Sequence, residues 1–435
     1  MSRVFTYNKK NFKNLSFFIY GLGATGKSTI NFLKRRDAIN YTVWDDNLKF
    51  RRKYRSKISS NIKKSLKSVD YIVLSPGINL KKSQYKKDLK KFRKKLITDI
   101  DLLYLSNNNF KSIVITGTNG KSTTCKIITH LLKKNNFKVQ LGGNIGTPVL
   151  DLKIKKNFII VIEASSFQLS HSKFIHPSYA LLLNITNDHL DWHGSMQNYL
   201  QSKLKIFNLQ KKNDFALINE NLKKYYTRKK FSGKCLLIKK KDYLKIKNKI
   251  KNNYLKSNAN DENMSFVYIL SKLLKINTNT FIKTMSSFEG LAHRYEVFFK
   301  KKGVTFINDS KSTSFQSAKL ALSGGQNIFW ILGGLPKKND KIILKHLKNK
   351  IIKTYIIGKN INFFKKQLKN SVKYTVSKNL KNAIISALRD IKLEKRFNNT
   401  ILFSPGAASF DQFKNFEVRG DKFKELSKIY AKKFI

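Results

Sequence analysis

Two glycine-rich segments of the chain carry the residue types that bind phosphate. The first, residues 21–28, reads Gly-Leu-Gly-Ala-Thr-Gly-Lys-Ser, and the second, residues 116–123, reads Thr-Gly-Thr-Asn-Gly-Lys-Ser-Thr. In such a loop glycine lets backbone N–H groups turn inward, the following helix adds partial positive charge, and the lysine reaches the outer phosphates. Both segments are therefore candidates for holding a nucleotide.

Polar residues at the ends of two later strands favour the second segment as the ATP site. The predicted strand Phe158–Ile162 is followed by Glu163, and the predicted strand Ala180–Leu183 is followed shortly afterwards by His189. In an open α/β sheet, groups at the carboxyl ends of strands converge on the ligand crevice. A carboxylate and an imidazole beside a phosphate loop can hold Mg²⁺ against ATP phosphates. We predict that ATP binds at Gly117, Thr118, Asn119, Gly120, Lys121, Ser122 and Thr123.

The first segment fits two descriptions that exclude each other. Its glycines, lysine and serine have the spacing of a phosphate loop. The same three glycines fit the dinucleotide fingerprint, and Asp45 and Asp46 stand about 20 residues later, where a carboxylate can bond a ribose hydroxyl. A turn with a purely structural role is a third interpretation. We predict that this segment binds a nucleotide-like group other than ATP.

The charge of the chain is dominated by lysine. Lys and Arg total 88 against 26 Asp and Glu, which gives a formal net charge of +62. Such an excess is typical of proteins that bind nucleic acid or anionic membranes. Only 12 of the 88 basic residues are Arg, the side chain suited to bidentate recognition of phosphate and guanine. Because the lysines are scattered among abundant Asn, Ile and Phe, we interpret them as a solvated surface shaped by an A/T-rich genome, with no specific nucleic-acid partner.

Length and hydropathy indicate a globular protein with several domains. The 435 residues suggest two to four domains at about 100–200 residues each, and 41% hydrophobic residues suffice for buried cores. Apolar runs break after about five residues, whereas a membrane-spanning helix needs about 20. The two cysteines, Cys125 and Cys235, exclude a disulfide framework. We expect a cytoplasmic protein that does not enter the membrane.

The elements that must position these residues alternate along the chain. Short β-branched or aromatic runs such as Tyr41–Trp44 and Tyr71–Leu74 are followed by lysine-rich helical stretches, which is typical of parallel α/β sheets. We predict domain boundaries near residues 100 and 290. The stretch Lys81–Lys95 has the apolar spacing of an amphipathic helix, and residues 223–251, the least patterned part, read as exposed loops.

Several motifs, in this order along the chain, together resemble the Mur ligase family, ATP-dependent enzymes that join amino acids to carboxylates. They are the loop at 116–123, the segments 163–169, 184–193 and 290–296, and the tail 404–420, which reads Ser-Pro-Gly-Ala-Ala-Ser-Phe-Asp-Gln-Phe-Lys-Asn-Phe-Glu-Val-Arg-Gly. The resemblance implies a three-domain α/β architecture. A Rossmann-like domain at 1–100 would bind the UDP part of the substrate, a P-loop ATPase-like domain with a mostly parallel sheet at 101–290 would bind ATP, and a Rossmann-like domain at 291–435 would bind the amino acid.

The motifs are most similar to those of family members that add D-glutamate. They imply a ligase that uses ATP to join D-glutamate to UDP-N-acetylmuramoyl-L-alanine through an acyl phosphate, in peptidoglycan synthesis. The implied partners are these three small molecules, and the implied state is a monomer in the cytoplasm. On this resemblance the first loop is a substrate site and its Lys27 is a decoy. The matching UDP-substrate positions are Leu22, Thr25, Asp45, Ser75, Pro76, Gly77 and Asn144.

The resemblance also assigns the metal and ATP positions. Ser122 and Glu163 would ligate one Mg²⁺ and His189 a second, and Lys203 would carry a CO₂-derived carbamate that positions the metal. The positions that match nucleotide contacts are Asn263, Arg294 and Asp309. The implied catalytic residues are Lys121, His189, Lys203 and Lys311.

Four positions of the last domain match the D-glutamate contacts of the family. They are Thr313, Lys337, Ser409 and Phe416. The chain departs from the family pattern at three places nearby. Residues 257–260 read Ser-Asn-Ala-Asn and lack the usual histidine, Leu335-Pro336 replaces a more polar loop, and Ser314 stands where asparagine is usual.

Three rival interpretations make different predictions. A sister ligase adding another amino acid, or a folylpolyglutamate synthetase, would lack the tail at 411–420 and the uridine-type first loop. A basic nucleic-acid-binding P-loop NTPase would cluster arginine or aromatic residues on a base-reading surface. A non-catalytic relative would have lost some of Lys121, Glu163, His189 and Lys203, all of which are present.

Overall fold

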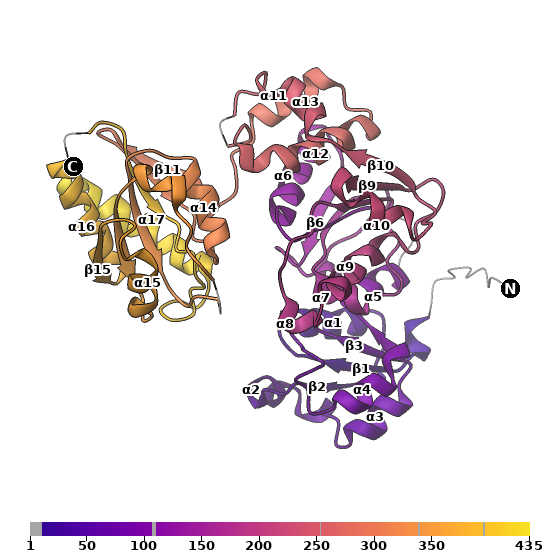
Figure 1. Cartoon of the computed structure of the whole chain (residues 1–435). Coiled ribbons are helices and arrows are strands. Elements are labelled where there is room, and N and C mark those ends of the chain that lie inside the picture. The colour runs from indigo at the N-terminus through magenta and orange to yellow at the C-terminus, as the bar shows by residue number, and fades with distance from the viewer. Residues whose placement is uncertain (1–10, 107–109, 253, 338–339, 395) are drawn as a thin grey trace. The chain divides into compact units, whose positions relative to one another are not determined.

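The computed structural model describes residues 11–106, 110–252, 254–337, 340–394 and 396–435. The chain divides into two compact units, residues 1–288 and 289–435. The first unit contains two sheets and the second unit contains one, each covered by helices (Figure 1). The predicted α/β class with mostly parallel sheets is confirmed.

The first sheet is short and wholly parallel. Its four strands have the order β2-β1-β3-β4, and Phe17–Tyr20 of the central strand are all buried, as expected when helices cover both faces. The strands are β1 (Phe17–Tyr20), β2 (Tyr41–Trp44), β3 (Tyr71–Leu74) and β4 (Leu96–Ile97). The helices are η1 (Phe12–Asn14), α1 (Ala24–Lys34), α2 (Leu48–Arg51), η2 (Arg52–Lys57), α3 (Ile62–Ser68), α4 (Lys86–Lys91), η3 (Arg93–Lys95) and α5 (Asp99–Ser106).

The second sheet has six parallel strands in the order β10-β9-β8-β5-β7-β6, so the strand that leads into the second glycine loop is central. The strands are β5 (Lys111–Thr116), β6 (Val139–Gly143), β7 (Ile159–Glu163), β8 (Tyr179–Leu182), β9 (Phe215–Asn219) and β10 (Lys234–Ile238). The helices are α6 (Lys121–Lys134), η4 (Val149–Asp151), α7 (Ser166–His171), α8 (Leu190–His193), α9 (Met196–Leu204), η5 (Lys205–Phe207), η6 (Glu220–Leu222), α10 (Lys223–Thr227), α11 (Lys240–Lys247), η7 (Asn258–Asn260), α12 (Asp261–Leu273) and α13 (Thr278–Ser286).

The third sheet forms the second unit. Its order is β11-β12-β16-β13-β14-β15, and its only antiparallel pair among the described residues is the edge pair β11–β12. The strands are β11 (Glu296–Lys301), β12 (Val304–Asn308), β13 (Ile328–Gly333), β14 (Ile351–Ile357), β15 (Tyr374–Lys378) and β16 (Asn399–Phe403). The helices are α14 (Phe315–Ser323), η8 (Lys345–Lys350), α15 (Ile361–Leu368), α16 (Leu380–Leu393) and α17 (Phe416–Phe434).

Two sequence predictions about local structure are wrong. The α-helix expected over Lys81–Lys95 covers only Lys86–Lys91, because residues 79–85 form turns in which Asn79 and Ser83 side chains bond the backbone. Residues 223–251 hold α10, β10 and α11 in place of loops. Because β10 pairs only with β9, at the sheet edge, its outer face stays exposed and its sequence lacks a buried pattern.

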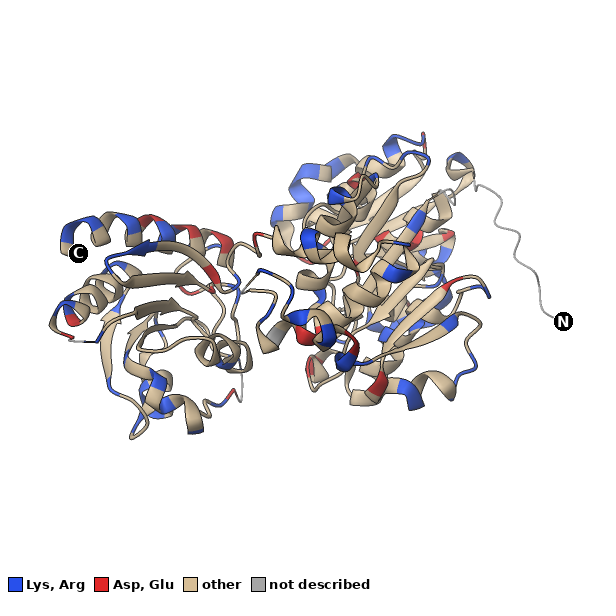
Figure 2. Ribbon diagram, turned by 90° about the horizontal axis from the view of Figure 1, so that it is seen from above, with Lys and Arg blue, Asp and Glu red and all other residues tan. Residues whose placement is uncertain are grey.

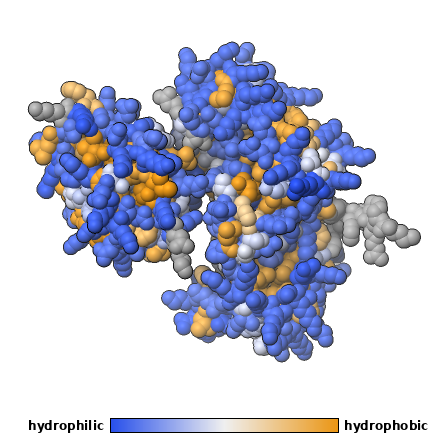
Figure 3. All heavy atoms as spheres, in the orientation of Figure 1, coloured by the Kyte–Doolittle hydropathy of each residue, from blue (hydrophilic) through white to orange (hydrophobic). Residues whose placement is uncertain are grey.

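Lys and Arg lie on helices and loops throughout both units, with Asp and Glu interspersed (Figure 2). The face seen in Figure 3 is mostly hydrophilic, and its apolar residues form separate patches. No helix among the described residues combines the length and the apolar character that a bilayer-spanning segment needs.

Two buried carboxylates join the first sheet to the second within the first unit. Asp101 accepts hydrogen bonds from the backbone N–H groups of Lys173 and Phe174, both at 2.8 Å. Asp99 accepts from the Gln168 amide at 3.2 Å, and Gln168 Oε1 accepts in turn from the N–H of Ser165. This chain of bonds fixes α7, which starts directly after the strand that ends in Glu163.

Replacing Asp99 with Asn is expected to raise the free energy of unfolding at pH 8 by about 1–3 kcal/mol. Burial raises the pKa of Asp99 to about 6 from the ordinary 3.8, although the Gln168 bond opposes this. The fold therefore favours the protonated carboxyl, and the stability it contributes is complete below pH 3.8 and is lost as the pH rises through 6. Urea unfolding at pH 4 and pH 8 measures the difference, which should nearly vanish at pH 4.

The control is Asp37→Asn, because Asp37 is 73% exposed and its ion pair with Lys13 lies at the surface. This change should alter the unfolding free energy by less than about 0.5 kcal/mol at both pH values. An equal effect of the two substitutions at pH 8 would contradict the buried-charge explanation.

Candidate active site

The second glycine loop joins the central strand β5 to helix α6, and the helix begins at Lys121 itself. Gly120 caps this helix with a φ of 81°, a conformation that favours glycine. A Cβ at Gly120 would lie 2.1 Å from Oδ1 of Asn263 on α12. A side chain at this position would be strained and would force Asn263 to move, and Asn263, a predicted nucleotide contact, lies directly against the loop.

An asparagine that the sequence prediction missed holds the loop from the next strand. Asn184, just after β8, accepts from the N–H of Asn119 at 2.8 Å and donates to the Asn119 carbonyl oxygen at 3.2 Å. It also donates to Glu262 of α12, which accepts a second bond from Asn219, the last residue of β9. The backbone of Asn119 is thus tied to two strand ends and a helix. The position of Asn184 at a strand end was the available signal.

Two of the predicted catalytic lysines meet at one backbone oxygen. Lys121 Nζ and Lys203 Nζ each donate to the carbonyl oxygen of Gly117 at 2.8 Å. Lys203 lies on α9 and is only 1% exposed. Burial, with the nearby Lys121 charge, holds the pKa of the Lys203 ammonium well below its usual range. A buried amine with a lowered pKa has the neutral form that reacts as a nucleophile.

Tyr199, one turn before Lys203 on α9, is a second residue that the sequence prediction missed. Its hydroxyl is 3.1 Å from Oγ1 of Thr118 in the loop, and its ring centroid is 4.6 Å from Lys203 Nζ. The ring also approaches the His189 ring, with centroids 6.5 Å apart. Tyr199 therefore contacts three predicted site residues. The four-residue spacing from Lys203 on one helix face was its only sequence signal.

Glu163, the last residue of β7, has the properties of a cation ligand. Its side chain is 2% exposed; Oε1 accepts from Asn144 Nδ2 at 3.0 Å, and Oε2 is buried without a hydrogen-bond partner. A buried carboxylate oxygen without a partner is costly unless a cation binds it, so this residue fits Mg²⁺. Ser122, its predicted co-ligand, is the second residue of α6 and is buried.

His189 follows β8 in the left-handed region with a φ of 53°. Its Nε2 is 3.3 Å from Asp188, and its ring lies 4.7 Å, centroid to centroid, from that of Phe167. Among the described residues, no three His, Cys, Asp or Glu side chains gather in a metal-ligating arrangement. The predicted metal set therefore depends on a hydroxyl and on Lys203 as well as on Glu163 and His189.

The first glycine loop differs from the second in where its helix begins. Helix α1 starts at Ala24, so Lys27 lies a turn inside the helix and is exposed. Gly26 packs on the loop, where a Cβ would lie 2.0 Å from the Gly21 carbonyl oxygen. Lys27 therefore does not stand at the start of its helix, as Lys121 does in the second loop. This difference agrees with the interpretation that Lys27 has the sequence spacing of a phosphate-loop lysine but does not bind the phosphates of ATP.

The predicted UDP-substrate residues surround this loop at the strand ends. Asp45, after β2, accepts from the N–H of Leu22 at 2.7 Å, and Ser75, after β3, donates to the Gly21 carbonyl oxygen at 2.8 Å. Asn144 stands apart from them, after β6, bonded to Glu163. The remaining predicted UDP-substrate residues are close to these in the sequence. Thr25 is the second residue of α1, and Pro76 and Gly77 directly follow Ser75.

In the second unit, Asp309 follows β12 and both of its carboxylate oxygens are bonded. Oδ2 accepts from the Ser404 hydroxyl at 2.7 Å and Oδ1 from the N–H of Tyr295 at 3.1 Å. Burial raises the pKa of Asp309 to about 7, although the Ser404 bond and the Arg294 charge oppose this. Arg294 is half-buried near it. Two predicted nucleotide contacts are thus electrostatic neighbours.

Three of the predicted D-glutamate residues lie on loops at the carboxyl ends of β12, β13 and β16, and the fourth, Phe416, is the first residue of α17. Lys311 Nζ lies 3.6 Å from the ring centroid of Phe416. Thr313 precedes α14, whose N-cap is Ser314, so the serine found in place of asparagine keeps a capping oxygen. Ser409 is buried, whereas Lys337 is exposed.

The departure at Leu335-Pro336 leaves the backbone pairing of that loop intact. Leu335 exchanges two backbone hydrogen bonds with Ala408, at 2.8 and 2.9 Å. Because the backbone makes this link, the loop that carries Lys337 is held beside the Ser409 loop whatever the side chain at 335.

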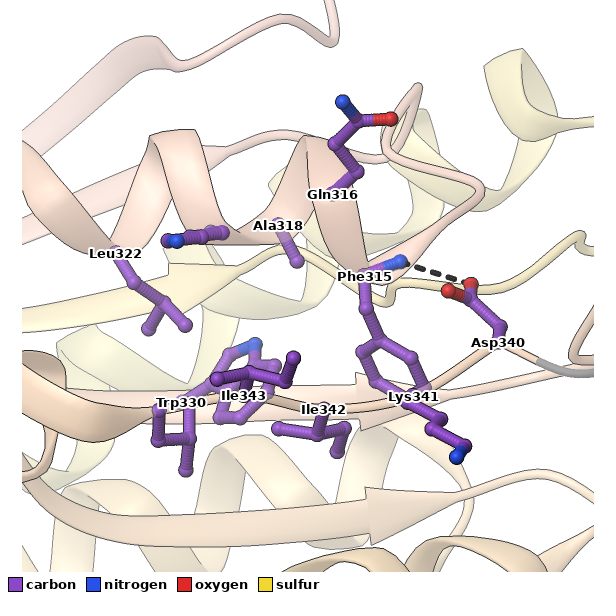
Figure 4. A pocket seen from close by; sticks show the side chains of 11 residues that line it. Phe315, Gln316, Ala318, Leu322, Trp330, Asp340, Lys341, Ile342 and Ile343 are labelled. Atoms are coloured by element: carbon purple, nitrogen blue, oxygen red, sulfur yellow. Dashed lines mark hydrogen bonds between the residues drawn. The ribbon is translucent and has the colours of Figure 1, made fainter. Parts of the chain in front are cut away.

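A pocket of about 210 Å³ lies between α14, β13 and residues 340–344 (Figure 4). Asp340 accepts from the N–H of Phe315 at 3.0 Å at its rim, and Trp330 and Leu322 form apolar walls. None of the predicted site residues lines this pocket. Its mostly apolar lining, which includes residues of α14, distinguishes this pocket from the polar strand-end loops that carry the predicted site residues.

Comparisons with known proteins agree with the geometry of the two glycine loops and the strand ends. Residues 115–282 match the Mur ligase middle domain model and residues 16–94 match the model of a MurD-like Mur ligase N-terminal domain. The UDP-N-acetylmuramoylalanine–D-glutamate ligase of Rickettsia felis is 35% identical, with 95% of this chain and 97% of that protein covered. The enzyme of the same name from Bartonella henselae is 32% identical, with 95% and 97% covered.

Solved structures show the same fold at low identity. The MurF ligase of Thermotoga maritima in complex with ADP is 18% identical, with a TM-score of 0.55 and 97% of each chain covered. The UDP-N-acetylmuramate–alanine ligase MurC of the same organism is 16% identical, with a TM-score of 0.55 and 96% of this chain and 100% of that one covered.

Proposed function

Because the chain belongs to the Mur ligase family, we propose that it adds D-glutamate to UDP-N-acetylmuramoyl-L-alanine at the expense of ATP, a step of peptidoglycan synthesis. Relatives that are 30–35% identical over about their whole length carry the name of this ligase. The observation that carries the proposal is local. A glycine loop with Lys121 at the start of α6 meets a buried Lys203 and lies at the strand ends near the buried carboxylate of Glu163.

The residues of the second sheet are suited to activating a carboxylate. A carboxylate oxygen of the substrate's alanyl group attacks the γ-phosphorus of ATP, the bond to the bridging oxygen of ADP breaks, and an acyl phosphate forms. The N–H groups of residues 117–123 and Lys121 stabilise the charge on the transferring phosphoryl group. The D-glutamate amine then attacks the acyl carbon, phosphate leaves with the carboxylate oxygen, and the nitrogen releases one proton as the amide forms.

We assign the metal role to Ser122, Glu163, His189 and Lys203, which when loaded with two Mg²⁺ ions would neutralise charge on the phosphates. The unpartnered Glu163 oxygen supports the first ion. Lys203 is proposed to react as the neutral amine with CO₂, giving a carbamate and releasing one proton. Its burial and lowered pKa support this chemistry. The carbamate would replace a cation by an anion where the metal needs a ligand.

The second unit is proposed to bind the incoming amino acid and part of ATP. Arg294 and Asp309 would contact the nucleotide, Lys311 would approach the phosphates, and the D-glutamate carboxylates would bind at Thr313, Lys337, Ser409 and Phe416. Asn263 would act through Gly120, which it contacts. In the first unit, Leu22, Thr25, Asp45, Ser75, Pro76, Gly77 and Asn144 would hold the UDP-substrate.

The chain is proposed to work as a cytoplasmic monomer with three functional domains, bounded near residues 100 and 290. The location follows from its use of ATP and a UDP-linked precursor. We propose no specific nucleic-acid partner, because the lysines are distributed over both units with acids among them (Figure 2). Binding to DNA at low salt should then weaken steeply as salt rises.

A phosphate-release assay tests the proposed reaction. With ATP, Mg²⁺ and UDP-N-acetylmuramoyl-L-alanine, D-glutamate is expected to stimulate phosphate release strongly, whereas L-glutamate, L-lysine and meso-diaminopimelate should give at most a few per cent of that rate. The same substrates without the UDP-linked acceptor serve as the blank. Preference for another amino acid would identify a sister ligase, and no stimulation by any of the four would reject the assignment.

A further inference from the structure

Arg419, on the first turn of α17, is one of the largest fully buried side chains of the molecule. It is 1% exposed, and burial lowers the pKa of its guanidinium to about 10. Its Nε donates to the Ser310 hydroxyl at 3.1 Å and its Nη2 to the Ser310 carbonyl oxygen at 2.8 Å. Two nitrogens of the planar guanidinium therefore donate hydrogen bonds to one residue, Ser310, of the loop that follows β12.

The Ser310 hydroxyl links Arg419 by a second hydrogen bond to the backbone at the start of α17. Ser310 Oγ accepts from Arg419 and donates to the carbonyl oxygen of Phe416 at 2.8 Å, so the hydroxyl's single donor and one of its lone pairs are used. Lys311, the next residue, places its Nζ 3.6 Å from the Phe416 ring centroid. One bond network thus fixes the backbone on either side of the Lys311–Phe416 contact.

The third nitrogen of Arg419 faces the loop after β13. Nη1 is buried without a hydrogen-bond partner, and it lies 3.2 Å from where a Cβ of Gly334 would stand. That same Cβ would lie 2.3 Å from the Ala408 carbonyl oxygen. Arg419 therefore packs where the loops after β12, β13 and β16 come together. These loops and the start of α17 carry all four residues proposed for D-glutamate.

The cost of this arrangement argues against a purely structural role. In the described part of the chain Arg419 forms no ion pair within 4.0 Å, and the charges of Asp411 and Asp309 act on its guanidinium only from a greater distance. A buried guanidinium without a close ion pair and with one unbonded nitrogen is more costly than an apolar side chain of similar size. An apolar residue could fill the same space. What it could not do is hold Ser310 by two directed bonds at once.

We propose that Arg419 is a positioning residue for amino-acid binding: through Ser310 it sets the relative placement of Lys311 and Phe416, and so the affinity for D-glutamate. This inference rests on the proposed function. Arg419 itself touches no substrate, because its atoms are buried behind Ser310. Its effect reaches the site through the hydroxyl and carbonyl oxygen of that one residue.

The test measures KM for D-glutamate and for UDP-N-acetylmuramoyl-L-alanine in four variants. Ser310→Ala removes the hydroxyl and should raise KM for D-glutamate about tenfold, since one bond to a charged group is lost. Arg419→Lys keeps the charge but not the fork and should raise it about tenfold to a hundredfold, and Arg419→Met should raise it further. KM for the UDP-linked substrate, whose proposed residues lie in the first unit, should change less than about twofold.

The matched control is Ser427→Ala on the same helix. Ser427 is as buried as Ser310, and its hydroxyl has no hydrogen-bond partner, so KM for D-glutamate should stay at the wild-type value. If Arg419→Met does not fold, Ser310→Ala and Arg419→Lys decide. The inference is overturned if both keep the wild-type KM for D-glutamate, or if KM for both substrates rises equally. Wild-type protein that does not use D-glutamate would instead reject the proposed function.

Discussion

Replacing Lys121 with Ala is expected to abolish phosphate release, with a loss of about a thousandfold or more in kcat. Lys121 begins α6, and its Nζ lies 2.8 Å from the carbonyl oxygens of both Gly117 and Thr118, at the rim of the loop. Removing a positioned charge from a transferring phosphoryl group costs several kcal/mol in the transition state, of the order of 4 kcal/mol. The measurement is phosphate release with all three substrates at saturation.

Lys27→Ala is the matched control for this prediction, because Lys27 occupies the corresponding sequence position in the first glycine loop. It is exposed and lies a turn inside α1, so the change should leave the rate within about twofold of wild type. Both variants should bind the UDP-linked substrate normally by isothermal titration calorimetry. Should Lys27→Ala be the variant that destroys ATP binding, the roles of the two loops would have to be exchanged.

Replacing Lys203 with Ala is expected to lower kcat at least about a hundredfold, and added formate or acetate should restore part of the activity. The reason is chemical. An unmodified ammonium would repel metal ions, whereas the carbamate formed from the neutral amine and CO₂ supplies an anionic oxygen. A small carboxylate can enter the space left by the side chain and supply that oxygen instead.

The carbamate itself can be observed without an activity assay. In ¹³C-bicarbonate buffer the wild-type protein should show a carbamate carbonyl signal by NMR, and Lys203→Ala should lack it. Lys205, two residues after Lys203, is not a suitable control position for the alanine substitution. Its Nζ donates to the Ser170 carbonyl oxygen, and the residue is partly buried. Lys212 is exposed, and Lys212→Ala should keep both the signal and the rate. Near-full activity of Lys203→Ala, or no rescue at any carboxylate concentration, would falsify the carbamate assignment.

Local sequence determined most of the elements and is the basis on which we predict ATP at the second of the two phosphate loops. The runs Tyr41–Trp44 and Tyr71–Leu74 are strands with the predicted bounds, because consecutive β-branched and aromatic residues suit a sheet buried on both faces. The Gly-Lys-Ser of the second loop, followed by strands that end near Glu163 and His189, is the signal from which the sequence predicts the ATP site. These signals are readable because each depends on residues a few positions apart.

Tertiary structure alone decided which lysine among so many is buried. The family resemblance singles out Lys203, but its neighbours in the sequence do not distinguish it from the many other lysines. Only the packing of α9 against the loop after β5 brings its Nζ to the Gly117 carbonyl oxygen. The extent of the helix near Lys81 was instead set locally, because the Asn79 and Ser83 side chains each accept from a backbone N–H two residues on, which periodicity does not register.

The hydrogen bonds of Arg419 are the clearest example of an arrangement that local sequence patterns do not predict. Ser310 and Arg419 are 109 positions apart, and no local pattern relates a serine after one strand to an arginine on the last helix. The sequence contained Arg419 within the tail motif, but its burial, its two bonds to one residue and its unpartnered nitrogen arise only when β12, β13, β16 and α17 pack together. Local periodicity determines elements, whereas burial and the pairing of distant polar groups depend on how those elements pack.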